Sequence, residues 1–180
     1  MPKQKTIGIR QPETQYIDRY AVRIVALNTS GDIAVIYAEK GNYYKLPGGG
    51  TEVDEDHHIA AQREVEEEIG ATVSLRGTGC IATTEEFRND LHQISYCYTA
   101  DVLDTSGHPS LIEEERIDGL SHRWMPVDEA LETMDLAEPT SELGCYIQKR
   151  DIYLFAEAKK ALDDEKDREL RTSYSNRGWL

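Results

Sequence analysis

Residues 48–71 read GGGTEVDEDHHIAAQREVEEEIGA, a run of glycines followed by an acidic segment. A helical pattern extends over residues 57–69 of this stretch. Within it, Glu64, Glu67 and Glu68 stand at positions i, i+3 and i+4, so their carboxylates share one helical face. The stretch therefore predicts a glycine loop that leads into a helix with three carboxylates on one side.

An apolar stripe lies beside these carboxylates. Ala61, Val65 and Ile69 stand at positions i, i+4 and i+8, and we expect them to pack on a sheet. Gly70 is a suitable C-cap for the helix. The carboxylates then lie along the edge of the buried face, where each like-charge pair costs about 0.2–0.5 kcal/mol or more. Clustered hard oxygen ligands suit Mg²⁺ or Mn²⁺, which would offset this repulsion.

The glycine loop supplies a second element of the predicted site. Gly48, Gly49 and Gly50 lack a Cβ, so the backbone can bring a carbonyl close to a metal or an amide close to a phosphate. Glu55 precedes Arg63 by eight residues, and a bidentate ion pair between them would hold the loop to the helix. A solvated acidic face or a flexible turn would explain each feature alone, but their joint spacing favours a site.

The rest of the chain predicts a mixed sheet with helices packed on it, an α/β (α+β) fold. Apolar runs at 16–27 and 33–37 flank a turn at 28–32, which is typical of a β-hairpin. Residues 113–115 form an acidic loop or the start of a helix. Further strands are expected over 43–46, 72–84, 91–103 and 120–127, and further helices over 128–134, capped by Asp128, and 141–162.

The length of 180 residues suits one domain. We expect an N-terminal arm or edge segment over residues 1–15 and the domain itself over residues 16–162. Charge dominates residues 163–180 and the core pattern fades there, so we predict a disordered tail.

Charge and composition exclude several classes of partner. The net charge of −14 makes duplex nucleic acid a poor partner, whereas a small phosphorylated substrate can still bind where a metal reverses the local field. No apolar run is long enough for a membrane span, and the first residues lack the apolar centre of a secretory signal, so we expect a cytoplasmic protein without membrane contact. The oligomeric state stays open, and a homodimer is one alternative.

The three cysteines, Cys80, Cys97 and Cys145, are odd in number and form no C-x-x-C pair. A disulfide framework or a zinc site is therefore not expected. Buried reduced thiols fit this pattern.

Residues 49–71 fit the pattern Gly-x5-Glu-x7-Arg-Glu-Val-x-Glu-Glu-x-Gly-Ala, which resembles the Nudix box. One mild departure is Ala71, where the family usually has a larger aliphatic residue. Residues 44–49 resemble the strand that enters the box, and residues 123–131 resemble the last strand and the following helix of the family. Roughly residues 16–160 fit this resemblance.

The resemblance implies a Nudix fold, a mixed β-sheet sandwiched between helices with a loop–helix–loop catalytic motif. It implies hydrolysis of a diphosphate bond by a metal-activated water, with Mg²⁺ (or Mn²⁺) as cofactor. The substrate would be a nucleoside diphosphate linked to another group: a nucleoside triphosphate, an oxidised nucleotide or a nucleotide sugar. The implied metal ligands are Glu64, Glu67, Glu68 and the carbonyl of Gly48. Glu55 and Arg63 would orient the loop and the first of these glutamates.

The resemblance does not place the general base, which is Glu64 or a glutamate of the 113–115 segment, with Glu114 and Glu115 as the main candidates. Candidates for substrate binding lie outside the box. Cationic side chains that could bind phosphate are Arg23, Lys40 and Lys45. Aromatic side chains that could stack on a base are Tyr43 and Tyr44. His57 and His58 are expected at the surface rather than on a metal.

Two other functions stay open. A diphosphoinositol polyphosphate hydrolase would need a dense basic cleft, which is not evident with 20 Lys and Arg against 34 Asp and Glu. A catalytically inactive Nudix-like ligand-binding module usually lacks carboxylates of the box, and here all are present.

Overall fold

A computed structural model describes residues 2–177 of the chain. The strands, in chain order, are β1 (Lys3–Ile7), β2 (Ile17–Leu27), β3 (Asp32–Ala38), β4 (Tyr43–Lys45), β5 (Thr72–Leu75), β6 (Ala82–Arg88), β7 (Leu91–Asp104) and β8 (Leu120–Pro126). The helices are α1 (His57–Ile69), α2 (Glu113–Ile117), α3 (Val127–Leu136) and α4 (Glu142–Arg177).

The sheet is mixed, as the sequence predicts. Its strand order is β1-β6-β7-β2-β3-β4, with β5 paired to β7 and β8 paired to β3. Pairing is parallel between β1 and β6 and between β2 and β7, and antiparallel elsewhere. Strand β1 is thus an edge strand, which agrees with the arm or edge segment expected near the N-terminus.

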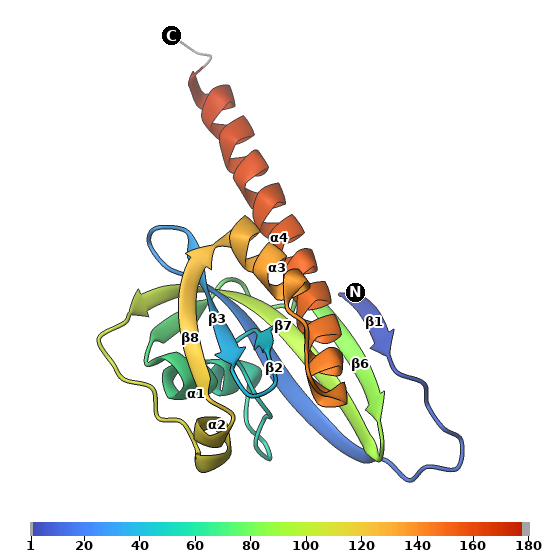
Figure 1. Cartoon of the computed structure of the whole chain (residues 1–180). Helices are drawn as coiled ribbons and strands as arrows, with labels where there is room; N and C mark the ends of the chain where they lie inside the picture. Colours follow the sequence, from blue (N-terminus) through green and yellow to red (C-terminus); the bar gives the residue numbers. More distant parts are fainter. Residues whose placement is uncertain (1, 178–180) are drawn as a thin grey trace.

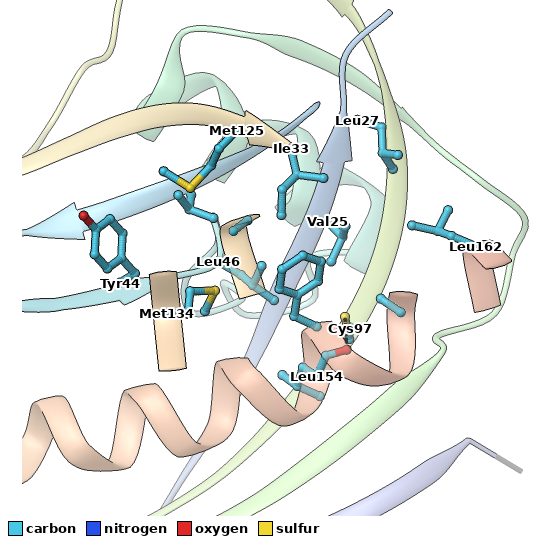
Figure 2. Close-up of a cluster of buried hydrophobic side chains, with 14 of the residues drawn as sticks. Val25, Leu27, Ile33, Tyr44, Leu46, Cys97, Met125, Met134, Leu154 and Leu162 are labelled. Carbon is cyan, nitrogen blue, oxygen red and sulfur yellow. Dashed lines mark hydrogen bonds between the residues drawn. The ribbon is translucent and has the colours of Figure 1, made fainter. Parts of the chain in front are cut away.

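Two hydrophobic cores cover the two faces of the sheet, and β2 contributes to both by strand alternation. Val22, Ile24 and Ala26 pack with α1 in one core. Val25 and Leu27 point to the opposite face, where they pack with residues of α3 and α4. Figure 2 shows this second core, with side chains of the helices facing those of the strands. The sheet is therefore sandwiched between helices, and α4 crosses one of its faces (Figure 1).

The predicted hairpin between β2 and β3 is present at its turn, where Leu27 pairs with Ile33. The Asn28 side chain holds this turn by accepting hydrogen bonds from the backbone N–H groups of Ser30 and Asp32. Further along β2, the partner is the loop after β4, because Ile24 N donates to Pro47 O at 2.9 Å. The glycine loop is thereby fixed against the middle of the sheet.

Several predicted elements differ from the structure. The strand expected over residues 72–84 is two strands, β5 and β6, which both pair with β7 and are separated by a loop with Gly77 and Gly79. Glycine disfavours strand structure, which explains the interruption. The predicted cap at Asp128 is wrong, because α3 begins at Val127 with Pro126 as its N-cap residue. Asp128 instead lies in the first turn, where its charge complements the helix dipole.

The disordered tail predicted over residues 163–180 is wrong for the residues that the structure describes, because α4 continues to Arg177 and extends beyond the sheet (Figure 1). Salt bridges support this continuation: Lys159 pairs with Asp163 at 2.8 Å, one turn along, and Glu165 pairs with Arg76 at 3.6 Å. Residues 178–180 of the predicted tail, like Met1, lie outside the described residues. Within residues 2–177, no helix combines the length and hydropathy that a membrane span requires.

Candidate active site

Helix α1 has the predicted bounds, and local signals explain them. The Asp56 side chain accepts a hydrogen bond from His58 N at 2.7 Å, and Gly70 ends the helix with a left-handed φ of 68°. The buried stripe of the helix draws Glu64 and Glu68 toward the sheet, where the two residues are only 8% and 3% exposed. The side chain of Glu67 remains 45% exposed.

The glycine loop fits against these glutamates only because it lacks side chains. A Cβ at Gly49 would collide with the carboxylate of Glu64, and a Cβ at Gly48, whose φ is 131°, would collide with the Val22 carbonyl. Gly48 N donates to Glu68 Oε2 at 2.7 Å, so the loop is also hydrogen-bonded to the helix. The loop and the acidic face are therefore shaped to each other.

Arg63 connects the loop to the acidic face. Its Nε and Nη2 donate to the two carboxylate oxygens of Glu55 at 2.8 and 2.9 Å, which is the bidentate pair that the spacing predicts. Nη2 also donates to the Gly50 carbonyl at 3.0 Å. Nη1 donates to Glu64 at 2.8 Å and to Glu67 at 3.3 Å. These bonds raise the pKa of Arg63, chiefly through Glu55, and lower the pKa of Glu55.

The environment of Glu64 disfavours the charge of its carboxylate. Burial raises its pKa, the hydrogen bond from Arg63 opposes this shift, and the nearby charge of Glu68 adds to it. Glu68 has a partner of its own, because Lys45 Nζ lies 2.5 Å from its Oε1. A further cation near Glu64 would favour the ionised form of this side chain.

A cavity of about 540 Å³ lies between the glycine loop, α1, α2 and the first turns of α4. The predicted site residues that line it are Arg23, Tyr43, Lys45, Gly48, Arg63, Glu64, Glu67, Glu114 and Glu115. Glu55 and Glu68 do not line it and instead hold Arg63 and Lys45 in place.

Tyr44, predicted to bind substrate, does not line the cavity. Alternation along β4 places Tyr43 and Lys45 on the cavity side and Tyr44 on the opposite side. Tyr44 lies in the core (Figure 2). Its ring centroid lies 4.7 Å from that of Tyr37. Its hydroxyl accepts a hydrogen bond from Arg123 Nη1 at 3.1 Å.

Two further candidates also lie outside the cavity lining. Lys40 is exposed and pairs with Asp118 at 3.1 Å. Glu113 is exposed and pairs with Arg116 at 3.5 Å.

The remaining acidic candidates lie on α2, at the rim of the cavity. Glu115 accepts a hydrogen bond from Ile112 N at 3.0 Å and so caps its own helix. Glu114 is the more exposed of the two. The structure thus separates a capping glutamate from one that can face a ligand.

The histidines that precede the acidic face are more buried than predicted. Both His57 and His58 are half-buried, and His57 Nδ1 lies 2.7 Å from the Tyr98 hydroxyl. The ring of His57 also packs on Tyr96 at 4.5 Å. Neither histidine lines the cavity.

The sequence does not predict the floor of the cavity, which consists of polar residues of the sheet and α4. Its unpredicted members are the buried Glu86, Gln93 and Arg150, the half-buried Arg88 and the exposed Arg19. A signal was available in α4, because a charged pair, Arg150 and Asp151, interrupts its apolar positions; the two residues are 3% and 0% exposed.

Asp151 organises this floor. It accepts hydrogen bonds from Leu46 N at 2.9 Å and from Arg150 Nε at 2.6 Å, and its Oδ1 lies 3.7 Å from Arg23 Nε. Burial, with the neighbouring charge of Arg150, lowers the pKa of Arg23 to about 10. Arg23 therefore remains cationic at neutral pH and lies beside the glycine loop.

The acidic side chains around the cavity include donors that a divalent cation prefers. No group of three acidic, histidine or cysteine side chains among residues 2–177 is gathered closely enough to hold one as the side chains stand. Glu64 and Glu67 nevertheless both bond to one cationic nitrogen, Arg63 Nη1, so their oxygens converge on a point that suits positive charge. Carboxylates are the donors that Mg²⁺ and Mn²⁺ prefer, so the donor set fits such an ion.

Comparisons with known proteins identify the fold and the family. The chain is similar to the crystal structure of a MutT protein from Methanosarcina mazei Go1, with 18% identity and a TM-score of 0.52 over 82% of this chain and 99% of that one. It is also similar to a hydrolase of the NUDIX family from Clostridium perfringens, with 17% identity and a TM-score of 0.55 over 81% of this chain and 99% of that one. These likenesses show the fold.

A search of the curated proteins finds no match. The family model of the NUDIX domain, in contrast, matches residues 18–143. Because this match covers more than half of the chain and includes the complete box, the protein belongs to the Nudix hydrolase family.

Proposed function

We propose that the protein hydrolyses a diphosphate bond in a nucleoside diphosphate-linked substrate, with a divalent cation, Mg²⁺ or Mn²⁺, as cofactor. The substrate would be a nucleoside triphosphate, an oxidised nucleotide or a nucleotide sugar. The observation that carries the proposal is the meeting of Glu64, Glu67 and Arg23 around one cavity beside the glycine loop. Acceptors for a cation and a donor for phosphate then lie side by side, as a diphosphate substrate requires.

Glu64 and Glu67 would hold the cation, with Glu68 and the Gly48 carbonyl as further ligands once Lys45 leaves Glu68. When bound, the cation would neutralise the diphosphate and lower the pKa of the attacking water. Arg63 keeps the first two carboxylates together through Nη1.

Arg23 and Lys45 would bind the phosphate oxygens. Arg23 is buried, lines the cavity, and its Nε has no hydrogen-bond partner. A buried guanidinium nitrogen without a partner is rare, and a phosphate oxygen is a suitable acceptor for it.

We assign Glu114 as the general base. Glu64 is already bonded to Arg63, and Glu115 caps α2, whereas Glu114 faces the cavity from its rim. Its neighbour Glu113 does not line the cavity and is a matched control. Glu114→Gln should lower kcat by about 10²–10⁴-fold with little change in KM, and Glu113→Gln should change neither. Equal activity of the two variants would remove Glu114 from the mechanism and leave Glu64 as the base.

The reaction itself is tested by product analysis with a substrate panel. The panel contains nucleoside triphosphates, oxidised nucleotides, nucleotide sugars, dinucleoside polyphosphates and a diphosphoinositol polyphosphate, each with Mg²⁺, Mn²⁺ or a chelator. We expect cation-dependent cleavage of at least one nucleotide and loss of cleavage in Glu64→Gln. The exposed Glu66 on the same helix provides the control variant Glu66→Gln, which should stay active. No cleavage of any substrate by the wild-type protein would contradict the proposal.

A further inference from the structure

A row of three polar side chains crosses the floor of the cavity. Arg19 on β2 pairs with Gln93 on β7, and Gln93 pairs with Glu86 on β6. Residues paired in register point to the same face of a sheet, and all three line the cavity. The nucleotide site thus continues from the acidic helix onto a polar strip of the sheet, under α4.

Glu86 is the most unusual member of this row. The residue is only 1% exposed, and its Oε1 accepts a hydrogen bond from Arg88 Nε at 3.2 Å. Its Oε2 has no hydrogen-bond partner. Arg150 Nη1 lies 3.8 Å from Oε2, which is attractive but too long for a hydrogen bond. A buried carboxylate oxygen left in this state is costly, so a donor is missing.

Among the described residues, the buried side-chain atoms that lack partners lie on one face of the sheet. The buried side-chain atoms without partners in residues 2–177 are Arg23 Nε, Thr84 Oγ1 and Glu86 Oε2. Thr84 and Glu86 are two residues apart on β6, and Arg23 points to the same face from β2. Two of these residues line the cavity, which indicates a ligand that supplies both an acceptor and a donor.

The two unpaired groups require opposite chemistry. Arg23 can only donate hydrogen bonds and suits phosphate, as proposed above. An ionised Glu86 can only accept hydrogen bonds and would repel a phosphate. The group that it faces should therefore carry donors and no negative charge. Hydroxyls of a sugar meet this requirement, and acidic side chains bind ribose hydroxyls in other nucleotide sites.

We propose that Glu86 accepts a hydrogen bond from a sugar hydroxyl of the substrate and thereby selects substrates with a sugar next to the diphosphate. This inference rests on the proposed function and deepens it. The hydroxyl can come from the ribose of the nucleoside or from the second sugar of a nucleotide sugar. An apolar wall of Tyr43, Leu143 and Ile147 completes the cavity and can pack against the rest of the nucleoside.

The test compares Glu86→Gln with the wild type on ATP, 2′,3′-dideoxy-ATP, ADP-ribose and inorganic triphosphate. Loss of a charged hydrogen bond should lower kcat/KM by about 10–100-fold on substrates whose hydroxyl reaches Glu86. Inorganic triphosphate has no hydroxyl, and its kcat/KM should change by less than about threefold. Loss on ATP but not on dideoxy-ATP assigns the ribose of the nucleoside, and loss on ADP-ribose alone assigns the second sugar.

The control is Glu157→Gln, which also removes a mostly buried carboxylate. Glu157 bonds to Lys3 and Lys160 and does not line the cavity, so this variant should leave the preference unchanged. Glu86→Asp keeps the charge beside Arg88 but withdraws it from the cavity. This variant replaces Glu86→Gln if Glu86→Gln does not fold. We expect it to lose the preference for substrates with a sugar hydroxyl over inorganic triphosphate in the same way.

An equal fall of kcat/KM on all four substrates, triphosphate included, would overturn the inference while the proposed function stands. Such a result would mean that Glu86 only supports its neighbouring arginines or meets water. If the wild type hydrolyses none of the substrates, calorimetric titration with ADP-ribose still tests the inference apart from the proposed function. Weaker binding by Glu86→Gln than by the wild type would support it, and equal binding or no binding would overturn it.

Discussion

Arg63 binds Glu55 through one edge of its guanidinium, with Nε 2.8 Å from Oε1 and Nη2 2.9 Å from Oε2. The same guanidinium reaches the Gly50 carbonyl on the loop and Glu64 on the acidic face. A lysine could not bind both carboxylate oxygens of Glu55 and also reach the loop, because its charge and its donors are concentrated on one nitrogen. The position of the acidic face relative to the loop therefore depends on one side chain.

Arg63→Lys should lower kcat/KM by about 10–100-fold, as expected for a group that orients the ligands of a cation. Since hydrogen bonds between charged groups are lost, the free energy of unfolding should fall by about 1–3 kcal/mol. Denaturant unfolding and steady-state kinetics measure the two effects. Arg76→Lys, at an ion pair on the surface with Asp101, should change both by much less. Similar values for the two variants would contradict the role of Arg63.

Gly49→Ala should reduce activity, whereas the same substitution at a glycine away from the cavity should not. The added Cβ would collide with the Glu64 carboxylate and displace it from the point shared with Glu67. Gly79→Ala is the control, because a Cβ at Gly79 meets no atom within 4 Å. We expect a fall in kcat/KM of about 100-fold or more for the first variant, since a misplacement of about 1 Å is sufficient for that loss. The second should match the wild type.

The parts of the site that the sequence predicts are those fixed by local spacing. The bounds of α1 follow from a cap at Asp56 and a left-handed glycine at Gly70. The pair of Glu55 and Arg63 follows from their separation of eight residues. Both features lie within a few turns of one helix and its preceding loop, so local geometry determines them.

The floor of the cavity could not be predicted in this way. Glu86 comes from β6 and Arg150 from α4, and only the tertiary packing of the helix on the sheet brings them together. The position of Tyr44 in the core does not follow from the sequence, because β4 is three residues long, too short for alternation to reveal which face is buried. The continuation of α4 was missed because charged residues at helical spacing resemble a solvated tail until their ion pairs are known.

A pH dependence of stability is expected from His92. Its Nδ1 and Nε2 lie 2.7 and 3.0 Å from the carboxylates of Asp18 and Glu85, so both nitrogens carry protons when both bonds form. These bonds, the one to Asp18 first, raise the pKa of His92. Protonated His92 therefore stabilises the folded protein. This stabilisation is fully present at a pH below the ordinary pKa of histidine, and it is lost as the pH rises through the pKa of His92 in the folded protein. Because Asp18 is mostly exposed, we expect less than about 1 kcal/mol.

The free energy of unfolding should therefore differ more between wild type and His92→Gln at about pH 6 than at about pH 9. His122 provides a control of opposite sign, because burial lowers its pKa. Its contribution to stability is present at a pH above the ordinary pKa of histidine and is lost as the pH falls. The difference in the free energy of unfolding between wild type and His122→Gln should therefore be larger at about pH 9. Urea unfolding at the two pH values measures both differences in the free energy of unfolding. A difference for His92→Gln that grows with pH would contradict the stabilising role of protonated His92.

Cation binding should appear as a thermal shift. Burial raises the pKa of Glu64, so its ionised form destabilises the cation-free fold above the ordinary carboxyl pKa, and Glu64→Gln should be at least as stable as the wild type at neutral pH. Mg²⁺ or Mn²⁺ at about 100 times Kd should raise the Tm of the wild type by about 5–10 °C. Glu64→Gln should show little shift, and Glu66→Gln should show the full one. A full shift in Glu64→Gln would place the cation elsewhere.

The acidic face of α1 should be catalytic, and Glu67 is its most exposed carboxylate. The most direct test measures kcat/KM for the best nucleotide substrate with Mg²⁺ in wild type, Glu67→Gln and Glu66→Gln. These two glutamates are adjacent on one helix, but only Glu67 lines the cavity. We predict a fall in kcat/KM of about 100-fold or more for Glu67→Gln and a change of less than about twofold for Glu66→Gln. Equal activity of Glu67→Gln and the wild type would contradict it.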